Sequence, residues 1–378
     1  MGDVKRGTNS ASLKLFLARD VMTGRGVDQI LPHPCEPQLF ECYVASAVDY
    51  LRMAERQNGP ISRSLSLDYI RGDGLDELSR QAPDVRLINL EPAVTKSRTP
   101  ADKGINYRMN PENARALGVA GIHACVLANN HILDWGRQGL IEALDTLQRT
   151  DIATVGAGRN RNEADAPVVI DANGKGRVIL IALGCPTSGI PRSWQATADL
   201  PGINVLSEPP SRSIDQARSI LRAIKQPGDI AIVSIHWGGN WGHDISPRQR
   251  KLAHRLIDEA GVDVVFGHSS HHPKAIEVYR GKLVLYGCGD LINDYEGISG
   301  YEAYRDDLSL MYFCEISSAD GKLTSLEMVP FRIRSMRLAR AGSSDVNWMW
   351  NALRQPCAEF GTVVTLDSDG VLPVSYTH

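Results

Sequence analysis

The sequence has few aromatic residues, few cysteines and no long apolar run. Only 6% of its 378 residues are aromatic, and seven are cysteine. The cysteines are odd in number and show no CxxC spacing, which argues against a disulfide framework and favours a reducing compartment. No segment approaches the roughly 20 uninterrupted apolar residues of a membrane span. We therefore predict a cytoplasmic protein, either free or peripheral to the inner face of the membrane.

The sequence also lacks a large excess of charge of either sign. The chain has 41 basic and 44 acidic residues, a formal net charge of -3. This balance argues against a nucleic-acid partner, because nucleic-acid binders are usually strongly basic. The GxSxG, GxxxxGK[ST] and complete dinucleotide-loop motifs are missing too, so the sequence does not support a serine hydrolase, a P-loop protein or a nicotinamide enzyme.

Short apolar runs alternate with amphipathic stretches along the chain, which indicates an α/β layered domain. We predict strands at residues 13–18, 85–90, 125–128, 178–183, 230–235, 262–266, 275–279, 283–286, 308–316 and 361–366. Helices are expected at residues 38–56, 139–149, 214–224, 247–260 and 346–355. Ser246 and Pro247 provide the N-cap and first position of the fourth helix. The proline-rich stretch 186–210 should be an irregular surface excursion.

Polar side chains follow five of the expected strands at the point where each strand ends. They are Asp20, then Asn89 and Glu91, then Asn129, Asn130 and His131, then His236, and finally His268, His271 and His272. Loops at the carboxyl ends of strands form the ligand-binding crevice of an open α/β sheet. Mixed carboxylate, amide and imidazole groups suit a divalent metal: Mn, Fe or Zn, or Ca if oxygen ligands dominate.

Each group also has a purely structural interpretation. Asp20 could cap a turn, Glu91 could be a solvated strand end, and His236 could be a core histidine with a hydrogen-bond partner. The GHSSHHP segment is harder to explain by packing, because three histidines fall within five residues at a strand end. Because such polar groups recur at the ends of five strands, the pattern as a whole favours a ligand-binding or metal site.

These strand-end stretches resemble the CapA family of poly-γ-glutamate capsule biosynthesis proteins, whose fold is similar to that of calcineurin-like metallophosphoesterases. The matching stretches are DVMTGRG from Asp20, NLE from Asn89, ANNHILDWG from Ala128, GAG from Gly156, HWG from His236, GHSSHHP from Gly267 and YGCGD from Tyr286. The resemblance implies a layered α-β-β-α sandwich over residues 12–335. Residues 336–378 are then expected to be a C-terminal appendage packed on the same core.

The resemblance also implies a role for each strand-end group. The implied metal ligands are Asp20, Glu91, Asn130, His236, His268 and His271. His131 takes the place of the general acid of the phosphoesterases, and we count Asp20 and His271 as further catalytic candidates. Arg25, Trp237 and Asn129 are the candidates for substrate binding, with Lys274 or Arg19 as further cations.

Two positions depart from the family pattern. Arg19 stands where the family usually has glycine, so it either fills space near the first carboxylate or clamps an anion. Ser269 stands where a histidine is expected, which puts occupancy by two metal ions in doubt unless His268 or His272 compensates.

The function that follows is a metal-dependent, hydrolase-like enzyme of cell-surface poly-glutamate (polyamide) biosynthesis. Its substrate would be a polyglutamate-type polymer, a phosphoester or a peptide. One alternative is a peptide epimerase that acts on a lasso-type precursor, with Asp20 and one of His268, His271 or His272 on opposite faces of the Cα. Another is a non-catalytic accessory subunit of polymer synthesis. Residues 290–305 are expected to form either a lid or substrate loop or an ordinary surface loop.

Overall fold

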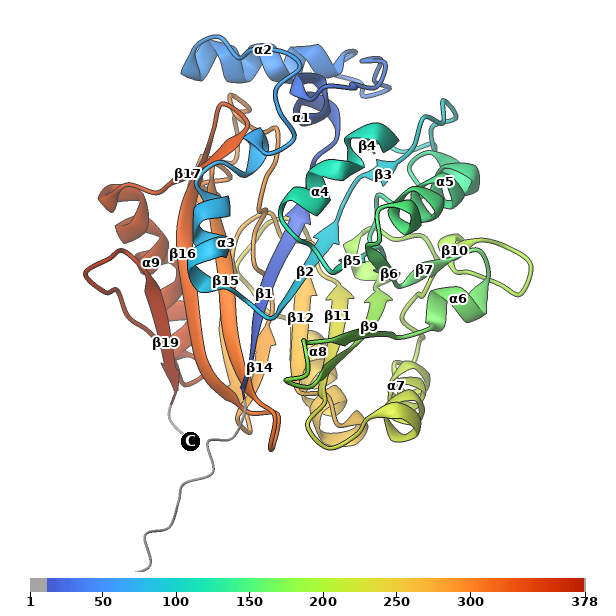
Figure 1. The fold of residues 1–378 in the computed structure, drawn as a ribbon, viewed down its shortest axis with the longest axis vertical. Helices are drawn as coiled ribbons and strands as arrows, with labels where there is room; N and C mark the ends of the chain where they lie inside the picture. Colours follow the sequence, from blue (N-terminus) through green and yellow to red (C-terminus); the bar gives the residue numbers. More distant parts are fainter. Residues whose placement is uncertain (1–11, 377–378) are drawn as a thin grey trace, which may run out of the picture.

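A computed structural model describes residues 12–376 of the chain. Two β-sheets face each other, and helices cover the outer side of each sheet (Figure 1). The layered α-β-β-α sandwich expected from the sequence is therefore confirmed. No helix within residues 12–376 has the length and apolar character that a membrane crossing requires.

The larger sheet has nine strands and runs in the order β18-β19-β16-β15-β1-β2-β5-β6, with β17 paired to β16. Strands β1, β2, β5 and β6 are parallel to one another, whereas the remaining strands are antiparallel to their neighbours. The strands are β1 (Ser12–Val21), β2 (Val85–Leu90), β5 (Ala124–Val126), β6 (Ala153–Val155), β15 (Leu308–Ser317), β16 (Leu323–Arg334), β17 (Arg337–Arg340), β18 (Thr362–Val364) and β19 (Leu372–Tyr376).

The smaller sheet has six strands in the order β13-β14-β12-β11-β9-β8. Its four central strands are parallel and its two edge strands are antiparallel. The strands are β8 (Val168–Asp171), β9 (Arg177–Gly184), β11 (Ile230–His236), β12 (Val264–His268), β13 (Ile276–Tyr279) and β14 (Lys282–Leu285). Two short ribbons pair β3 (Ala93–Val94) with β4 (Arg108–Met109) and β7 (Ala157–Gly158) with β10 (Gly202–Ile203).

Helices fill the outer layers and the connections. The α-helices are α1 (Arg25–Ile30), α2 (Ala47–Asn58), α3 (Gly74–Gln81), α4 (Arg115–Val119), α5 (Gly136–Arg149), α6 (Arg161–Asp165), α7 (Ser211–Ile224), α8 (Pro247–Arg255) and α9 (Ser343–Ala358). Short 3-10 helices are η1 (Tyr69–Arg71), η2 (Pro111–Ala114), η3 (Pro186–Ser188), η4 (Arg192–Trp194) and η6 (Glu302–Tyr304). A short π-helix, η5 (Leu256–Ala260), continues α8.

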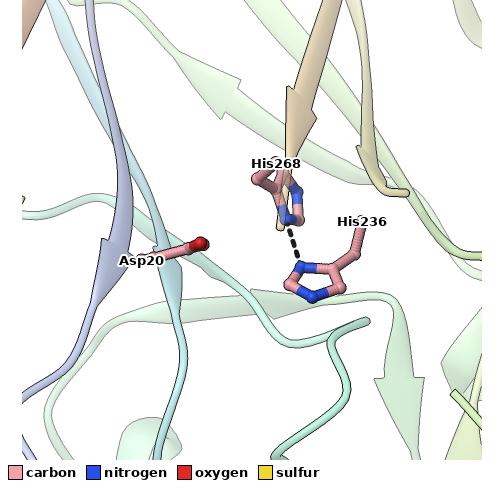
Figure 2. Close-up of side chains that lie close together, drawn as sticks. All are labelled: Asp20, His236 and His268. Carbon is pink, nitrogen blue, oxygen red and sulfur yellow. Dashed lines mark hydrogen bonds between the residues drawn. The ribbon is translucent and has the colours of Figure 1, made fainter. Parts of the chain in front are cut away.

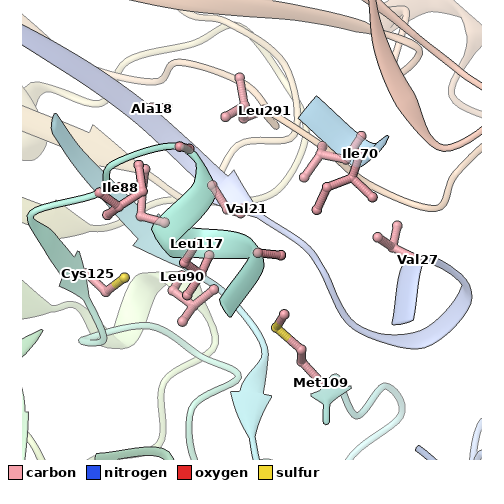
Figure 3. Packing of buried hydrophobic residues seen from close by; sticks show 14 of the residues in the cluster. Ala18, Val21, Val27, Ile70, Ile88, Leu90, Met109, Leu117, Cys125 and Leu291 are labelled. Atoms are coloured by element: carbon pink, nitrogen blue, oxygen red, sulfur yellow. The ribbon is translucent and has the colours of Figure 1, made fainter. Parts of the chain in front are cut away.

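Successive side chains along each strand point to opposite faces of the sheet, and this divides the hydrophobic core into layers. On β1, Leu13, Leu15 and Leu17 pack between the two sheets, whereas Phe16 and Ala18 pack under the helices of the outer layer. Figure 3 shows part of that outer layer, where Leu117 of α4 lies against the β1 and β2 side chains. Strands buried on both faces carry apolar residues at consecutive positions, which is why the sequence shows them as short continuous apolar runs.

The predicted helix at 38–56 is wrong in its first half, because α2 begins only at Ala47. The Ser46 side chain accepts a hydrogen bond from the Val48 N–H and so caps the helix there. Leu39 and Tyr43 fall on the apolar spacing of α2 by coincidence, since Tyr43 is exposed. The predicted strand at 125–128 is also too long, because the chain leaves the sheet after Val126.

Other local predictions are confirmed. Ser246 caps α8 through a complete capping box with Gln249, and Pro247 occupies the first turn. Residues 186–210 contain only η3, η4 and the two-residue β10. In the C-terminal segment, β18 and β19 extend the larger sheet beside β16 and α9 packs on the core between the sheets. The division of the chain after residue 335 stays a prediction.

Candidate metal centre

The polar strand ends of both sheets meet at one edge of the sandwich. The contributing groups are Asp20 at the end of β1, Glu91 after β2, Asn130 and His131 after β5, His236 at the end of β11, His268 at the end of β12, and Asp290 after β14. Figure 2 shows Asp20 on one side of this edge and the contacting rings of His236 and His268 on the other. Residues more than 200 positions apart thus converge, as a site built from strand ends requires.

Asp20 has a backbone conformation that bends β1. Its φ is +33°, and the pairing of β1 with β2 shifts in register between Ala18 and Val21. A β-bulge re-aims a side chain at the end of a strand, and a non-glycine residue at positive φ is held there only by its surroundings. The bulge turns the Asp20 carboxylate toward the other sheet.

Two carboxylates share one amide at the centre. The Asn89 Nδ2 atom donates to Asp20 Oδ1 at 2.6 Å and to Glu91 Oε2 at 2.5 Å. Asp20 Oδ2 is buried and has no hydrogen-bond partner within the described chain. Burial raises the pKa of Asp20, and burial together with the Asp20 charge raises the pKa of Glu91 well above its ordinary value.

His236 and His268 face each other across neighbouring parallel strands. Their Nδ1 atoms are 2.7 Å apart, and His268 Nε2 lies 2.7 Å from the Ser234 hydroxyl. His236 Nε2 lies 3.0 Å from Asn130 Oδ1 and 3.8 Å from Glu91 Oε1. Burial lowers the pKa of both imidazoles well below the usual value, so both are neutral at pH 7.

Both nitrogens of His268 are therefore engaged by protein groups. His236 keeps Nε2 among the oxygen atoms of Asn130 and Glu91, which makes it the better placed ligand of the pair. Ligand atoms of Asp20, His236 and His268 nevertheless lie within 4.8 Å of one another. His268 fits the role of a residue that orients His236, as the partners of metal-bound histidines commonly do.

A second group combines Asp20 with His271 and Asp290, whose ligand atoms also lie within 4.8 Å of one another. His271 Nδ1 is 2.9 Å from Asp290 Oδ1, and Asn293 Nδ2 donates to the other Asp290 oxygen at 2.9 Å. Burial works against the charged imidazole, but the Asp290 carboxylate outweighs it and raises the pKa of His271.

The sequence-based ligand set missed Asp290. The YGCGD segment matches the family pattern, but no role was assigned to Asp290, although it follows β14 as the other groups follow their strands. The prediction of a lid at residues 290–305 is wrong for the first half of that segment. Its first half, including Asp290, Asn293 and Asp294, is buried and builds the site and its support, and the exposed part is confined to residues near 297–303.

His131 lies beside the cluster with a fixed orientation. Its Nδ1 atom is 2.7 Å from Asp134 Oδ2, and Lys103 Nζ is 2.7 Å from the other Asp134 oxygen. Burial lowers the pKa of His131 to about 4. A neutral imidazole that donates from Nδ1 to Asp134 carries a lone pair on Nε2, so in this state His131 can accept a proton. Its role as a general acid stays a prediction.

Two predicted substrate-binding residues have other partners. The Arg25 guanidinium is buried and forms ion pairs with Asp294 at 2.5 Å and with Glu41 at 2.9 Å. Its charge is neutralised, so it does not fit the role of a free cation for substrate. Asn129 is fully buried, and its Oδ1 accepts the backbone N–H groups of His131 and Ile132. It positions the His131 loop and leaves no amide group for a substrate.

Arg19 is buried beside Asp20, and its guanidinium is not free to clamp an anion. Its guanidinium donates to the main-chain oxygens of Gly267 and Ser270, the latter at 2.8 Å. It therefore ties the end of β1 to the loop after β12. Ser269 has a φ of +109° and donates from Oγ to Gly238 O. His272 does not replace it, because its ring packs among Trp241, His243 and Tyr304.

Residues 14–295 match the family model described as bacterial capsule synthesis protein PGA_cap. The chain belongs to this family of bacterial capsule synthesis proteins. The resemblance to the CapA family drawn from the strand ends is thereby confirmed.

The relatives extend over most of the chain. A Mycobacterium tuberculosis protein named as a probable polyglutamine synthesis accessory protein is 45% identical over 97% of both chains. The PGA biosynthesis protein CapA of Bacillus subtilis is 31% identical over 78% of this chain and 65% of its own length. A solved structure described as a novel phosphatase of Mycoplasma pneumoniae aligns with a TM-score of 0.48 and 12% identity, covering 84% of this chain and 93% of that one.

Proposed function

We propose that this protein is a metal-dependent hydrolase that acts in the biosynthesis of a polyglutamate-type polymer. The observation that supports this best is the cluster of Asp20, Glu91 and Asp290 at one buried edge, with His236 Nε2 close to both Asn130 Oδ1 and Glu91 Oε1. The family supports a role in capsule synthesis, and two relatives are named for polyglutamine synthesis and for PGA biosynthesis.

The residues present fit a divalent cation. Asp20 Oδ2 is a buried carboxylate oxygen without a partner in the described chain, and burial raises the pKa of both Asp20 and Glu91. Such carboxylates are stabilised when a cation enters between them. Asp20, Glu91, Asn130 and His236 would hold one ion, with Asp20, His271 and Asp290 as a second set. Mixed oxygen and imidazole ligands suit Mn, Fe or Zn.

When bound, such an ion polarises a substrate oxygen and lowers the pKa of water toward about 7. The chain itself supplies the proton transfers. His131 Nε2 accepts the proton of the water that attacks the carbonyl carbon or phosphorus. The bond to the leaving nitrogen or oxygen breaks, and the leaving atom takes up that proton from His131. Asp134 stabilises the transient imidazolium through its hydrogen bond to Nδ1.

The test is elemental analysis of the purified full-length protein together with hydrolysis assays on γ-linked glutamate oligomers and on an aryl phosphate. The wild type should retain divalent metal, and the variant with Asp20, Glu91 and Asp290 all changed to alanine should lose it. Glu359→Ala, on the exposed end of α9, is the matched control and should keep the metal. Full metal occupancy in the triple variant would reject the proposal.

A non-catalytic accessory role is the second candidate, and Arg19 is the observation that favours it. Its buried positive charge sits next to Asp20 and offsets part of the rise that burial causes in the pKa of that carboxyl, so it supplies part of the neutralisation that a metal would provide. The M. tuberculosis relative is named an accessory protein. Wild-type protein that contains no metal and binds none would favour this role.

A further inference from the structure

A cavity of about 940 Å³ lies beside the candidate metal centre. It is at the upper end of the roughly 300–1,000 Å³ range of ligand pockets, so it is large enough for several linked units. Its walls come from the ends of β9 and β11, from the irregular excursion at 186–210, and from α8.

One loop separates the cavity from the metal centre. Trp237 directly follows His236, and Trp237 and Trp241 both line the cavity. On its other side the same loop contacts the candidate ligands, because the His271 N–H donates to Asn240 O at 2.9 Å and the Trp241 ring lies 5.2 Å from the His271 ring. A chain held in the cavity therefore lies next to the reactive edge.

The cavity combines apolar walls with an excess of positive charge. Trp241, Pro209 and Pro210 provide accessible apolar surface. Five cationic side chains and two carboxylates line it, although the whole chain has a net charge of -3. The cations are Arg192, Arg248, Lys251, Arg255 and Lys274, and the carboxylates are Glu208 and Asp244.

Three of these cations have no carboxylate partner within ion-pair distance in residues 12–376. Arg192 pairs with Glu208 and Arg255 pairs with Glu259, which leaves Arg248, Lys251 and Lys274. Unpaired cations at a concave surface concentrate anions near it.

Lys274 is the least exposed of the three, with 6% of its surface accessible. Its ammonium group is 3.3 Å from the main-chain oxygen of Asp244. Burial, and secondarily the nearby Arg19, lowers the pKa of Lys274 to about 8. A buried cation held only by a carbonyl is stabilised when an anion becomes its partner.

We propose that this cavity binds a short segment of a carboxylate-bearing, peptide-like chain and presents it to the neighbouring metal centre. The choice of a glutamyl chain as that polymer rests on the proposed function. Arg248, Lys251 and Lys274 pair with successive carboxylates, and the side chains of Trp241, Pro209 and Pro210 contact the methylene and amide groups between them. A polynucleotide is the competing polyanion, and the experiment distinguishes it from a glutamyl chain.

The test is titration of the full-length protein with a γ-linked glutamate octamer, followed by calorimetry and by the fluorescence of the cavity tryptophans. The matched probes are the same octamer with its side carboxylates amidated and a DNA oligomer of equal charge. The variants are Arg248→Gln combined with Lys251→Gln, and Lys274→Met. Arg56→Gln, an exposed arginine on α2 outside the cavity, is the control for loss of charge.

The wild type and Arg56→Gln should bind the octamer equally, and amidation should weaken binding at least tenfold. The double variant should also weaken binding at least tenfold. It changes only side chains that are not buried, so it decides the question even if Lys274→Met disturbs folding. Equal affinity for the amidated octamer, equal affinity for DNA, or a double variant indistinguishable from Arg56→Gln would overturn the proposal.

Binding is measured without added metal, and metal content is determined on the same samples. Octamer binding by a protein that holds no metal would reject the proposed hydrolase but keep the cavity proposal. Retained metal without octamer binding would reject the cavity proposal alone.

Discussion

Glu91→Gln should change stability in opposite directions in the absence and presence of metal. The Glu91 carboxyl is buried near Asp20, and its pKa is raised well above the ordinary value by burial and by the Asp20 charge. The neutral amide has almost the same shape and removes that unfavourable charge. The metal-free variant should therefore be at least as stable as the metal-free wild type at pH 8. It should lose the stabilisation that a divalent ion gives.

The size of that lost stabilisation follows from mass action. An ion present at 100 times its dissociation constant stabilises the folded state by about 2.7 kcal/mol. Unfolding entropy is about 2.1 cal/mol/K per residue, so the entropy for 378 residues is about 0.8 kcal/mol/K. Saturating Mn²⁺ should therefore raise the melting temperature of the wild type by about 3 °C. The melting temperature of Glu91→Gln should rise by less than about 1 °C.

The pH dependence has a defined sign. Asp20 and Glu91 have raised pKa values in the folded protein, so above the ordinary carboxyl pKa of about 4 the folded state holds more protons than the unfolded state. Their contribution to stability is thus present at low pH and is lost as pH rises toward the folded values. The buried imidazoles of His131, His236 and His268 have lowered pKa values and act in the opposite direction, but they do so in both proteins. Without metal, the melting temperature of the wild type should therefore fall relative to that of Glu91→Gln as pH rises through this window.

The assay is a thermal melt followed by circular dichroism between pH 4.5 and 8, with EDTA or with Mn²⁺. Glu359→Gln, on the exposed end of α9, controls for loss of one carboxylate and should behave as wild type. The reasoning would be refuted if Mn²⁺ stabilised Glu91→Gln as much as wild type, or if the metal-free variant were several degrees less stable at pH 8.

Three further substitutions test the site and the fold. Asp290→Asn removes the carboxylate that raises the pKa of His271, so the His271 imidazole should titrate at lower pH in NMR spectra and Mn²⁺ should bind more weakly. An unchanged titration of His271 would contradict its pairing with Asp290. Phe266→Ala leaves a cavity between the two sheets and should cost about 3–5 kcal/mol in urea unfolding, whereas a cost below about 1 kcal/mol would contradict the packing. Ser246→Ala breaks the capping box with Gln249 and should cost about 0.5–2 kcal/mol by the same method, with no change in Mn²⁺ affinity.

The convergence of the strand ends could be predicted because it depends on a local pattern and a general rule. A buried strand appears as a short apolar run, and its first polar residue marks where the chain leaves the sheet. Parallel strands direct those residues to one edge, and this placed Asp20, Glu91 and His236 together. The bounds of β2 were predicted without error for the same reason.

The partners of Arg25 and Asp290 could not be predicted in this way. Arg25 is 269 positions from Asp294, the residue that neutralises it. His271 and Asp290 meet only because the chain returns through β13 and β14. The sequence shows which side chains carry charge near a strand end, but the three-dimensional packing decides which of them remain available to a ligand.

Arg19 shows the consequence of such packing for the chemistry of the site. A guanidinium tied to the carbonyls of Gly267 and Ser270 is fixed in place, and its charge offsets part of the rise that burial causes in the pKa of Asp20. The same charge opposes a cation that approaches from its side. This repulsion is weakest for a cation that is coordinated on the side of Asp20 facing away from Arg19. The two candidate ligand sets share Asp20, so a fixed charge beside that carboxylate favours occupancy of one set at a time.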